Sequence, residues 1–210
     1  RAMGDSRGSL FYELWNELSW THAKWEEYTS LFASGDESIR WMNAVAPRCF
    51  HQIQTAMWRD IVLQICRLTD PPRSAGKENI SIDALGEQLD VPELGDRYEA
   101  ALAVARQRCK FARERRNRIY AHRDLLTARS QHPEPLADVS QKHIDDALDS
   151  ISAALNVVQQ FYEDSTTYYA ASRYSGDAEK LLRAVAAEAI RKEERMHEIG
   201  RISDGIDDHA

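Results

Sequence analysis

The stretch FYELWNELSWTHAKWEEYTSLF, residues 11–32, decides the fold class of this chain. Its apolar and semi-apolar side chains recur every three or four residues, at Phe11, Leu14, Leu18, Thr21, Trp25, Tyr28 and Phe32. Because an α-helix has 3.6 residues per turn, this spacing gathers them on one side of a helix. The sequence therefore predicts a long amphipathic helix with one buried side.

The same spacing predicts two more helices directly after this one. Ser34-Gly35 ends the first helix, and Asp36 or Ser38 can cap the next. Pro47 should break or kink the following run, because proline has no amide hydrogen and crowds the preceding turn. We expect a short helix before Pro47 and a long helix after it, as far as Leu68.

Breakers and polar residues divide the rest of the chain into further helices and two long loops. The expected order is a polar loop over 69–79, a short helix from Ser81, a break over 92–95, a long helix from about Asp96 to Ala121, a loop over 126–138, a helix from Ser140 or Gln141, and a charged helix from Asp177 to Glu198. Alternation typical of strands is not found, so the expected class is all-α with no sheet.

The length of 210 residues suits one well-buried domain. Residues 1–6 resemble an expression scar and are set aside. We expect a helical domain over 7–170, a C-terminal helix over 177–200 and a polar tail over 201–210. The thin apolar stripe of the C-terminal helix predicts packing in a dimer or across the bundle, with a frayed surface helix as the alternative.

The composition argues against a membrane protein and against a metal site. Hydrophobic residues make up 43% of the chain, and no apolar run approaches the ~20 residues that span a bilayer. With no charged-then-apolar leader, a cytoplasmic location is expected. Cys49, Cys66 and Cys109 are scattered and odd in number, so they are interpreted as small buried side chains. The histidines lack metal-binding spacing, and we expect no metal and no cofactor.

The net charge of −7 conceals a strongly basic segment. Residues 106–123 contain eight basic side chains against Glu114 alone, which gives this segment +7 and leaves −14 on the rest. Such a stripe favours capture of a polyanion at one place on an acidic body. The alternative is a solvated basic helix face that is paired with the acidic helices after it.

The end of this segment, RRNRIYAHRD at 115–124, sets permanent cations beside a titratable imidazole. Arg116 falls on the apolar stripe of its helix, where a charge is costly unless something pairs with it. His122 follows at or just past the helix end. Arg115 shares the side of His122 more closely, so the spacing does not decide which arginine works with the histidine. The plainer alternatives are an Arg116 bridged to an acid of a neighbouring helix and a His122 favoured by the helix dipole.

Arg116-Asn117 and His122, with five residues between the arginine and the histidine, resemble the signature of the HEPN ribonucleases (higher eukaryotes and prokaryotes nucleotide-binding domain). The opening LWNEL at 14–18, the loop over 67–79 and AHRD at 121–124 are similar to the abortive-infection U-type branch of that family. The resemblance covers about Leu10 to Phe161.

This resemblance implies a HEPN-like helical bundle with two long antiparallel helices and a C-terminal accessory helix. It also implies a homodimer in which the two Arg-x-His segments face each other across a cleft and cut RNA without metal. His122 would be the general base or acid, Arg116 would neutralise charge, and Asn117 would orient the phosphate or the arginine. Tyr120 would stack on a base or hydrogen-bond at the rim.

Other residues are expected to bind RNA or support the site: Arg115, Arg118, Arg123, Asp124 and Lys77. Lys77, Arg73 and Asp70 would place RNA or brace the cleft, or form only a polar connection. The resemblance favours an endoribonuclease of phage defence or of a toxin-antitoxin system, regulated by an antitoxin or another protein. The alternatives are a non-catalytic HEPN module that binds RNA, a nucleotide or a protein, and a structural dimer in which Arg116 is a core ion pair.

Overall fold

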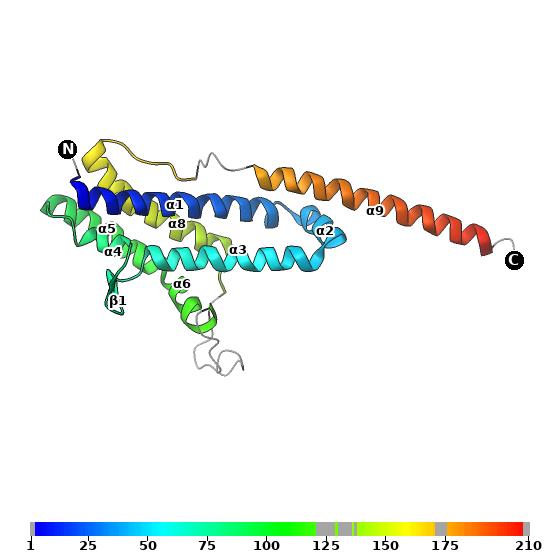
Figure 1. The fold of residues 1–210 in the computed structure, drawn as a ribbon, viewed down its shortest axis with the longest axis horizontal. Coiled ribbons are helices and arrows are strands. Elements are labelled where there is room, and N and C mark those ends of the chain that lie inside the picture. Colours follow the sequence, from blue (N-terminus) through cyan, green and yellow to red (C-terminus); the bar gives the residue numbers. More distant parts are fainter. Residues whose placement is uncertain (1–2, 121–128, 130–135, 137, 171–175, 208–210) are drawn as a thin grey trace. The chain divides into compact units, whose positions relative to one another are not determined.

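The computed structural model describes residues 3–120, 129, 136, 138–170 and 176–207, without the side chains of 200 and 202–207. The elements are α1 (Asp5–Phe32), α2 (Asp36–Val45), α3 (Pro47–Leu68), β1 (Arg73–Ser74), β2 (Lys77–Glu78), α4 (Ile82–Gly86), α5 (Pro92–Arg108), α6 (Lys110–Arg115), the π-helix η1 (Arg116–Tyr120), α8 (Gln141–Glu163) and α9 (Asp177–Asp207) (Figure 1). The expected all-α class is confirmed. None of the helices in these ranges combines the length and hydropathy needed to cross a bilayer.

The described residues form two compact units, each considered by itself below. Unit 1 comprises residues 1–24 and 59–172, and unit 2 comprises residues 25–58 and 173–210. Helices α1 and α3 each give one part to each unit. As expected, Pro47 divides α2 from α3, and it occupies the first turn of α3, where a missing amide hydrogen costs nothing.

The core of unit 1 lies where α5 packs along α8 (Figure 1). The last turn of α5 meets the first turns of α8, through Arg108 and Asp146, so the two helices run antiparallel. Apolar side chains from α1, α3, α5 and α8 are fully buried between them, among them Leu14, Leu18, Ile61, Ile65, Leu94, Leu102, Ile144 and Ile151. The 3–4 spacing of the sequence therefore marks the buried sides correctly.

The short helix α4 closes one end of this core against α5 and α8. The side chain of Ser81 accepts a hydrogen bond from the amide of Ala84, as expected for a residue that caps a helix. The buried hydroxyl of Tyr98 donates to the carbonyl of Ile82 at 2.7 Å. A Cβ at Gly86 would lie 3.2 Å from Cε1 of Tyr98, so a larger residue there would require the Tyr98 ring to move by a few tenths of an ångström.

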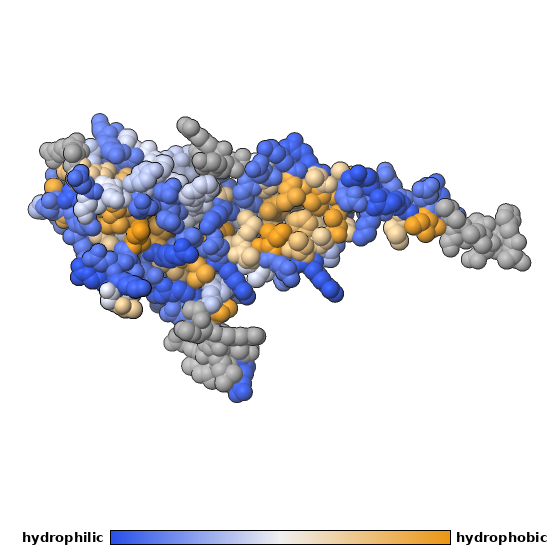
Figure 2. Space-filling model, in the orientation of Figure 1, coloured by the Kyte–Doolittle hydropathy of each residue, from blue (hydrophilic) through white to orange (hydrophobic). Residues whose placement is uncertain are grey.

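Unit 2 is held together by apolar side chains of α2, the first half of α9 and the adjoining parts of α1 and α3. Leu31, Met42, Leu182 and Val185 form its buried centre, and Figure 2 shows apolar surface where α2 and the start of α9 meet. Further along α9, Met196 and Ile199 are exposed. The apolar stripe of α9 is therefore covered by α2 only over its first half.

The expected helix over 96–121 is wrong at its beginning and in its middle. The helix begins at Pro92, because proline is well suited to the first turn, and the expected break over 92–95 does not occur. A single turn residue, Cys109, with φ −89° and ψ −1°, separates α5 from α6. The backbone then widens into η1 from Arg116 onward. The helix therefore bends and changes its repeat before the end of the basic segment.

Three smaller expectations also differ from the structure. The loop over 69–79 contains a two-stranded antiparallel hairpin, so the expected absence of a sheet fails at this one place. Ala75 and Gly76 both adopt positive φ, the conformation of a tight two-residue hairpin turn.

Cys66 and Cys109 are buried as expected, but Cys49 is exposed near the start of α3. Asp5 and Ser6, set aside as part of a scar, lie in the first turn of α1. Most of the expected loop over 126–138 lies outside the described residues.

A buried histidine joins α1 to α8 within unit 1. The hydroxyl of Ser152 donates to the carbonyl of Leu148 at 2.8 Å, so Nε2–H of His22 must donate to Ser152 Oγ, at 3.0 Å. The ring stacks on Tyr169 with 5.6 Å between centroids. Burial lowers the pKa of His22 from 6.5 to about 4. His22 is therefore neutral in the folded protein at neutral pH.

This burial predicts a loss of stability in mild acid. An unfolded chain protonates His22 near pH 6.5, whereas the folded chain resists protonation down to about pH 4, so the free energy of unfolding falls by about 3 kcal/mol across this interval. Denaturant unfolding from pH 7 to 4 should show a shallower pH dependence in His22→Gln, while His51→Ala, at an exposed position, should follow the parent. Equal slopes for the parent and His22→Gln would contradict the assignment.

Candidate functional site

The described residues of the expected motif, Arg115 to Tyr120, lie on α6 and η1, after the turn at Cys109. Ala112, on the inner side of α6, is buried, and Arg116 begins the π-helix. π-Helical turns are rare and are often found at functional sites. Because the repeat here is wider than 3.6 residues, the directions of the side chains after Arg116 do not follow the spacing of an ideal α-helix.

Arg116 is held by Asp70, which lies 46 residues earlier in the loop after α3. Nη1 of Arg116 donates to both carboxylate oxygens of Asp70, at 2.7 and 3.0 Å. The side chains are 28% and 21% exposed. The charge on the apolar stripe is therefore paired, as the sequence required, and the pair remains open to solvent.

The loop that carries Asp70 is tied down by the end of α3 and by a second arginine. The hydroxyl of Thr69 donates to the carbonyl of Ile65 at 2.8 Å, and the amide of Asp70 donates to the carbonyl of Arg67 at 3.3 Å. Nη2 of Arg113 donates to the carbonyl of Thr69 at 2.6 Å. Asp70 is thus presented to Arg116 from a fixed backbone position.

Asn117 makes the next contact of the arginine. Its Oδ1 accepts a hydrogen bond from Nε of Arg116 at 3.3 Å, an arrangement that one of its two expected roles requires. Within residues 3–120, 129, 136, 138–170 and 176–207, no acceptor lies against Nη2 of Arg116. Asp70 and Asn117 thus orient the guanidinium on two sides, and among the described residues its Nη2 edge is open to an anion.

The thiol of Cys66 is buried on α3, close enough to this pair for its charges to affect the pKa of the thiol. Burial, the largest effect, raises the pKa of Cys66 to about 11, while Arg116 and Arg113 lower it and Asp70 raises it. Burial likewise raises the pKa of Cys109 to about 12. Both thiols stay protonated at neutral pH, so they are packing groups beneath the site rather than nucleophiles.

Other expected site residues are placed differently. Tyr120 lies under the guanidinium of Arg59, with 5.8 Å from Cζ to the ring centroid. Arg115 and Arg118 are half-buried on the same segment. Lys77 is exposed in the hairpin, and no described contact joins it to Arg116. His122, Arg123 and Asp124 lie outside the described residues.

The structure also adds residues that the spacing alone did not identify. Arg113 precedes Arg116 by one turn in the same basic run, and that adjacency was the only local signal for its role. Arg59 lies 61 positions before Tyr120, and nothing in its neighbours along the chain distinguishes it. Asp70 was considered only as one of three polar loop residues.

The basic stripe divides into a neutralised part and a part with excess positive charge. Arg106 contacts Asp83 at 2.5 Å and Glu99 at 2.7 Å, and Lys110 contacts Glu114 at 3.7 Å. These side chains are paired, but with acids of α4, α5 and α6 rather than with the acidic helices after the segment. By formal count the excess lies further along, where residues 113–120 carry four arginines against Glu114, and Arg113 donates to the carbonyl of Thr69.

Comparison with known protein families identifies the family of this chain. The family model described as AbiU2, of the HEPN type, matches residues 8–181. The chain belongs to this HEPN family. The match confirms the family expected from Arg116-Asn117 and the segments around it. It reaches further than expected at the C-terminal end, because residue 181 lies in the second turn of α9. No curated protein and no solved structure matches the chain.

In this HEPN domain a cavity of about 310 Å³ opens beside the partner of Arg116. It is lined by Gln64, Arg67, Asp70 and Asn79, together with four acidic or apolar residues, Glu17, Leu68, Glu78 and Ile80. Asp70 therefore contacts Arg116 and also lines this cavity. In the described part of the chain, no three side chains of His, Cys, Asp or Glu are grouped closely enough to bind a metal ion.

Proposed function

We propose that this HEPN domain is an RNA endonuclease of a phage-defence or toxin-antitoxin system that works without metal. The observation that carries the proposal is the Arg116 guanidinium, which is oriented by Asp70 and Asn117 and is still 28% exposed. An oriented, partly exposed guanidinium suits a phosphoryl group, whose oxygens gain negative charge in the transition state. The basic excess on α6 and η1 favours a polyanionic substrate.

The proposed reaction uses the nucleophile that RNA carries and DNA lacks, the 2′-hydroxyl. A base removes the proton of this hydroxyl, its oxygen forms a bond to phosphorus, and the bond from phosphorus to the 5′-oxygen breaks. An acid gives a proton to the departing 5′-oxygen. The products are a 2′,3′-cyclic phosphate and a 5′-hydroxyl end. No electrons are transferred, and water is not consumed in this step.

Each residue of the motif has a proposed part in this reaction. His122 acts as general base or acid, and Arg116 neutralises the phosphoryl oxygens. Asn117 keeps the arginine in place through Nε. In a homodimer, His122 of the partner subunit would provide the second proton transfer. Arg115, Arg118 and Arg123 would hold the flanking phosphates, and an antitoxin or another regulatory protein would control access.

Cleavage in the presence of a chelator tests the reaction class. The protein should cut single-stranded RNA in excess EDTA, and should not cut the same strand when every 2′-hydroxyl is replaced by hydrogen. Phosphatase treatment should not free the 3′ end of a product until acid has opened the cyclic phosphate. Cleavage that stops in EDTA and returns with a divalent cation, or that also occurs in the deoxy strand, would refute the proposal.

The second candidate is a non-catalytic HEPN module that binds RNA, a nucleotide or a partner protein. The observation that favours it is the Arg116–Asp70 pair, because an arginine already held within its own subunit is suited to static recognition as well as to catalysis. RNA binding that survives His122→Ala, fails with Arg116→Ala and gives no product ends at any pH would favour this function.

A further inference from the structure

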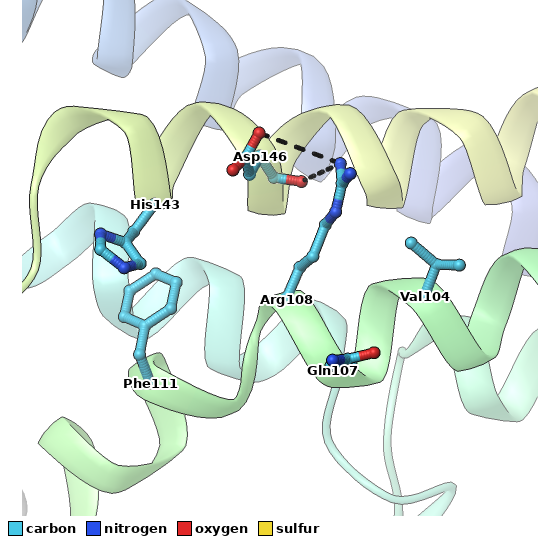
Figure 3. A pocket seen from close by; sticks show the side chains of 6 residues that line it. All are labelled: Val104, Gln107, Arg108, Phe111, His143 and Asp146. Carbon is cyan, nitrogen blue, oxygen red and sulfur yellow. Dashed lines mark hydrogen bonds and ion pairs between the residues drawn. The ribbon is translucent and has the colours of Figure 1, made fainter. Parts of the chain in front are cut away.

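A second surface feature of unit 1 lies on the other side of α6, between α5–α6 and the start of α8. It is a groove of about 430 Å³ lined by Val104, Gln107, Arg108, Phe111, His143 and Asp146 (Figure 3). Figure 3 shows the ring of Phe111 next to the His143 ring and the guanidinium of Arg108 reaching toward α8. The groove is large enough for one nucleotide, and the proposed reaction does not use it.

The groove offers an aromatic surface next to hydrogen-bonding groups. The rings of Phe111 and His143 meet edge to face, with 5.9 Å between their centroids. Val104, on α5, is 45% exposed and adds apolar surface to the lining of the groove. The amide of Gln107 is exposed, and no described residue bonds to it. A flat ring with an amide at its edge matches the face and the edge of a nucleobase.

His143 is fixed in one orientation by the cap of α8. The amide of Ser140 can only donate, so it must donate to Nδ1 of His143, at 3.1 Å. The neutral ring therefore carries its proton on Nε2. This leaves a hydrogen-bond donor on a ring that the capping box holds against Phe111. The wall of the groove is thus preorganised.

Arg108 is weakly engaged, in contrast to its neighbour Arg106. Its Nη1 lies 3.4 Å from the carbonyl oxygen of Asp146 and 4.0 Å from the carboxylate, which Lys142 already contacts at 3.2 Å. Arg106 makes three contacts of 2.5–2.8 Å with two acids, although both arginines are about equally exposed, at 46% and 45%. Arg108 can turn to a phosphate at little cost, because its long and exposed ion pair with Asp146 contributes little to stability.

Arg115 connects the groove to the arginine of the proposed reaction. Phe111 and Arg115 lie four residues apart on α6 and therefore on the same side. Arg116 turns to Asp70 on another side, about 7.5 Å further along the helix axis than Phe111. Arg115 lies between Phe111 and Arg116, both in the angle around the helix axis and in the position along it. A strand bound at Arg116 can therefore follow Arg115 into the groove.

We infer that this groove is a subsite that takes a nucleotide of the single-stranded RNA, with the base against Phe111 and its phosphate at Arg108. The inference rests on the proposed function for the identity of the strand. The base edge meets the amide of Gln107 and Nε2–H of His143. Arg115 continues the path of the backbone toward Arg116.

Binding measured without cleavage tests the subsite. In full-length His122→Ala protein, fluorescence anisotropy with a labelled strand of eight adenosines should show about tenfold weaker binding for Phe111→Leu, because a stacked base is lost. Arg108→Ala should lower the slope of log affinity against log salt by about 0.7, the value for one phosphate of a single strand. Arg106→Ala is the matched control and should bind within twofold of the parent.

Two further measurements keep the test sharp. If Phe111→Leu proves unstable in thermal unfolding, Gln107→Ala replaces it in the test. Gln107 is exposed, so this change should leave the fold intact and still weaken RNA binding. Adenosine monophosphate, titrated alone, distinguishes a free nucleotide as occupant: if Phe111→Leu weakens its binding but leaves the RNA unaffected, the RNA subsite is refuted. Equal RNA affinities for all variants also refute it.

The outcome is separable from that of the proposed function. If the parent cleaves RNA in EDTA while the groove variants bind RNA as the parent does, the subsite fails and the nuclease stands. If RNA binding depends on Phe111 and Arg108 but the parent never cleaves, the subsite stands and the nuclease fails.

Discussion

Replacing His122 with alanine is expected to lower the rate of RNA cleavage by about 10²–10⁴-fold, the contribution of one positioned acid or base. Arg116 would still bind the phosphate, so the affinity for RNA should stay close to that of the parent. Single-turnover cleavage with saturating enzyme measures the chemical step apart from binding. The rate constant should fall with little change in the concentration that half-saturates cleavage.

The matched control for this variant is His51→Ala, a histidine exposed on α3 within unit 2. It removes the same side chain from the same chain and passes through the same purification, so it should cleave like the parent. If His122→Ala and His51→Ala cleave equally, the activity comes from a contaminating ribonuclease, and His122 has no part in it.

Replacing Arg116 with alanine should lower cleavage by about 10²–10³-fold, because a preorganised donor aimed at developing phosphoryl charge is lost. Arg116→Lys should restore little, since an ammonium cannot hold Asp70, Asn117 and a phosphate in one plane as a guanidinium does. Stability should change by only about 1 kcal/mol, because the Arg116–Asp70 pair is partly exposed. Cleavage rates and urea unfolding of the same preparations check both expectations.

Arg106→Ala provides the comparison for this second prediction. It also removes an arginine that is paired with acids, on the preceding helix, but its partners Asp83 and Glu99 lie away from Asp70. A structural role for Arg116 predicts that both variants lose similar stability and that neither loses activity per folded molecule. A loss of 3 kcal/mol or more with Arg116→Ala and unchanged cleavage would favour the core ion pair and contradict the catalytic role.

Local sequence was enough to place most helices and their buried sides. The repeat of Phe11, Leu14 and Leu18, the cap at Ser81 and the break at Pro47 each depend on residues within one or two helical turns. The family could also be recognised, since its signature is a short local pattern. These features need no knowledge of what lies across the core.

The sequence was insufficient where the backbone responds to packing. The turn at Cys109 and the wide repeat from Arg116 interrupt a run that reads as one uninterrupted helix. Pro92 looked like a break because its ability to begin a helix and its ability to end one have the same local cause, the missing amide hydrogen. Helix propensity alone could not choose between them.

The sequence by itself determined that this chain is a helical HEPN domain, that Arg116 needs a partner and that positive charge gathers in one segment. Only the tertiary structure decided that the partner is Asp70, that Tyr120 lies under Arg59, and that Phe111 and His143 line a groove with Arg108. The physical reason is that helix formation depends on neighbours a few residues apart, whereas charge pairing and grooves depend on which distant segments the packed core brings together.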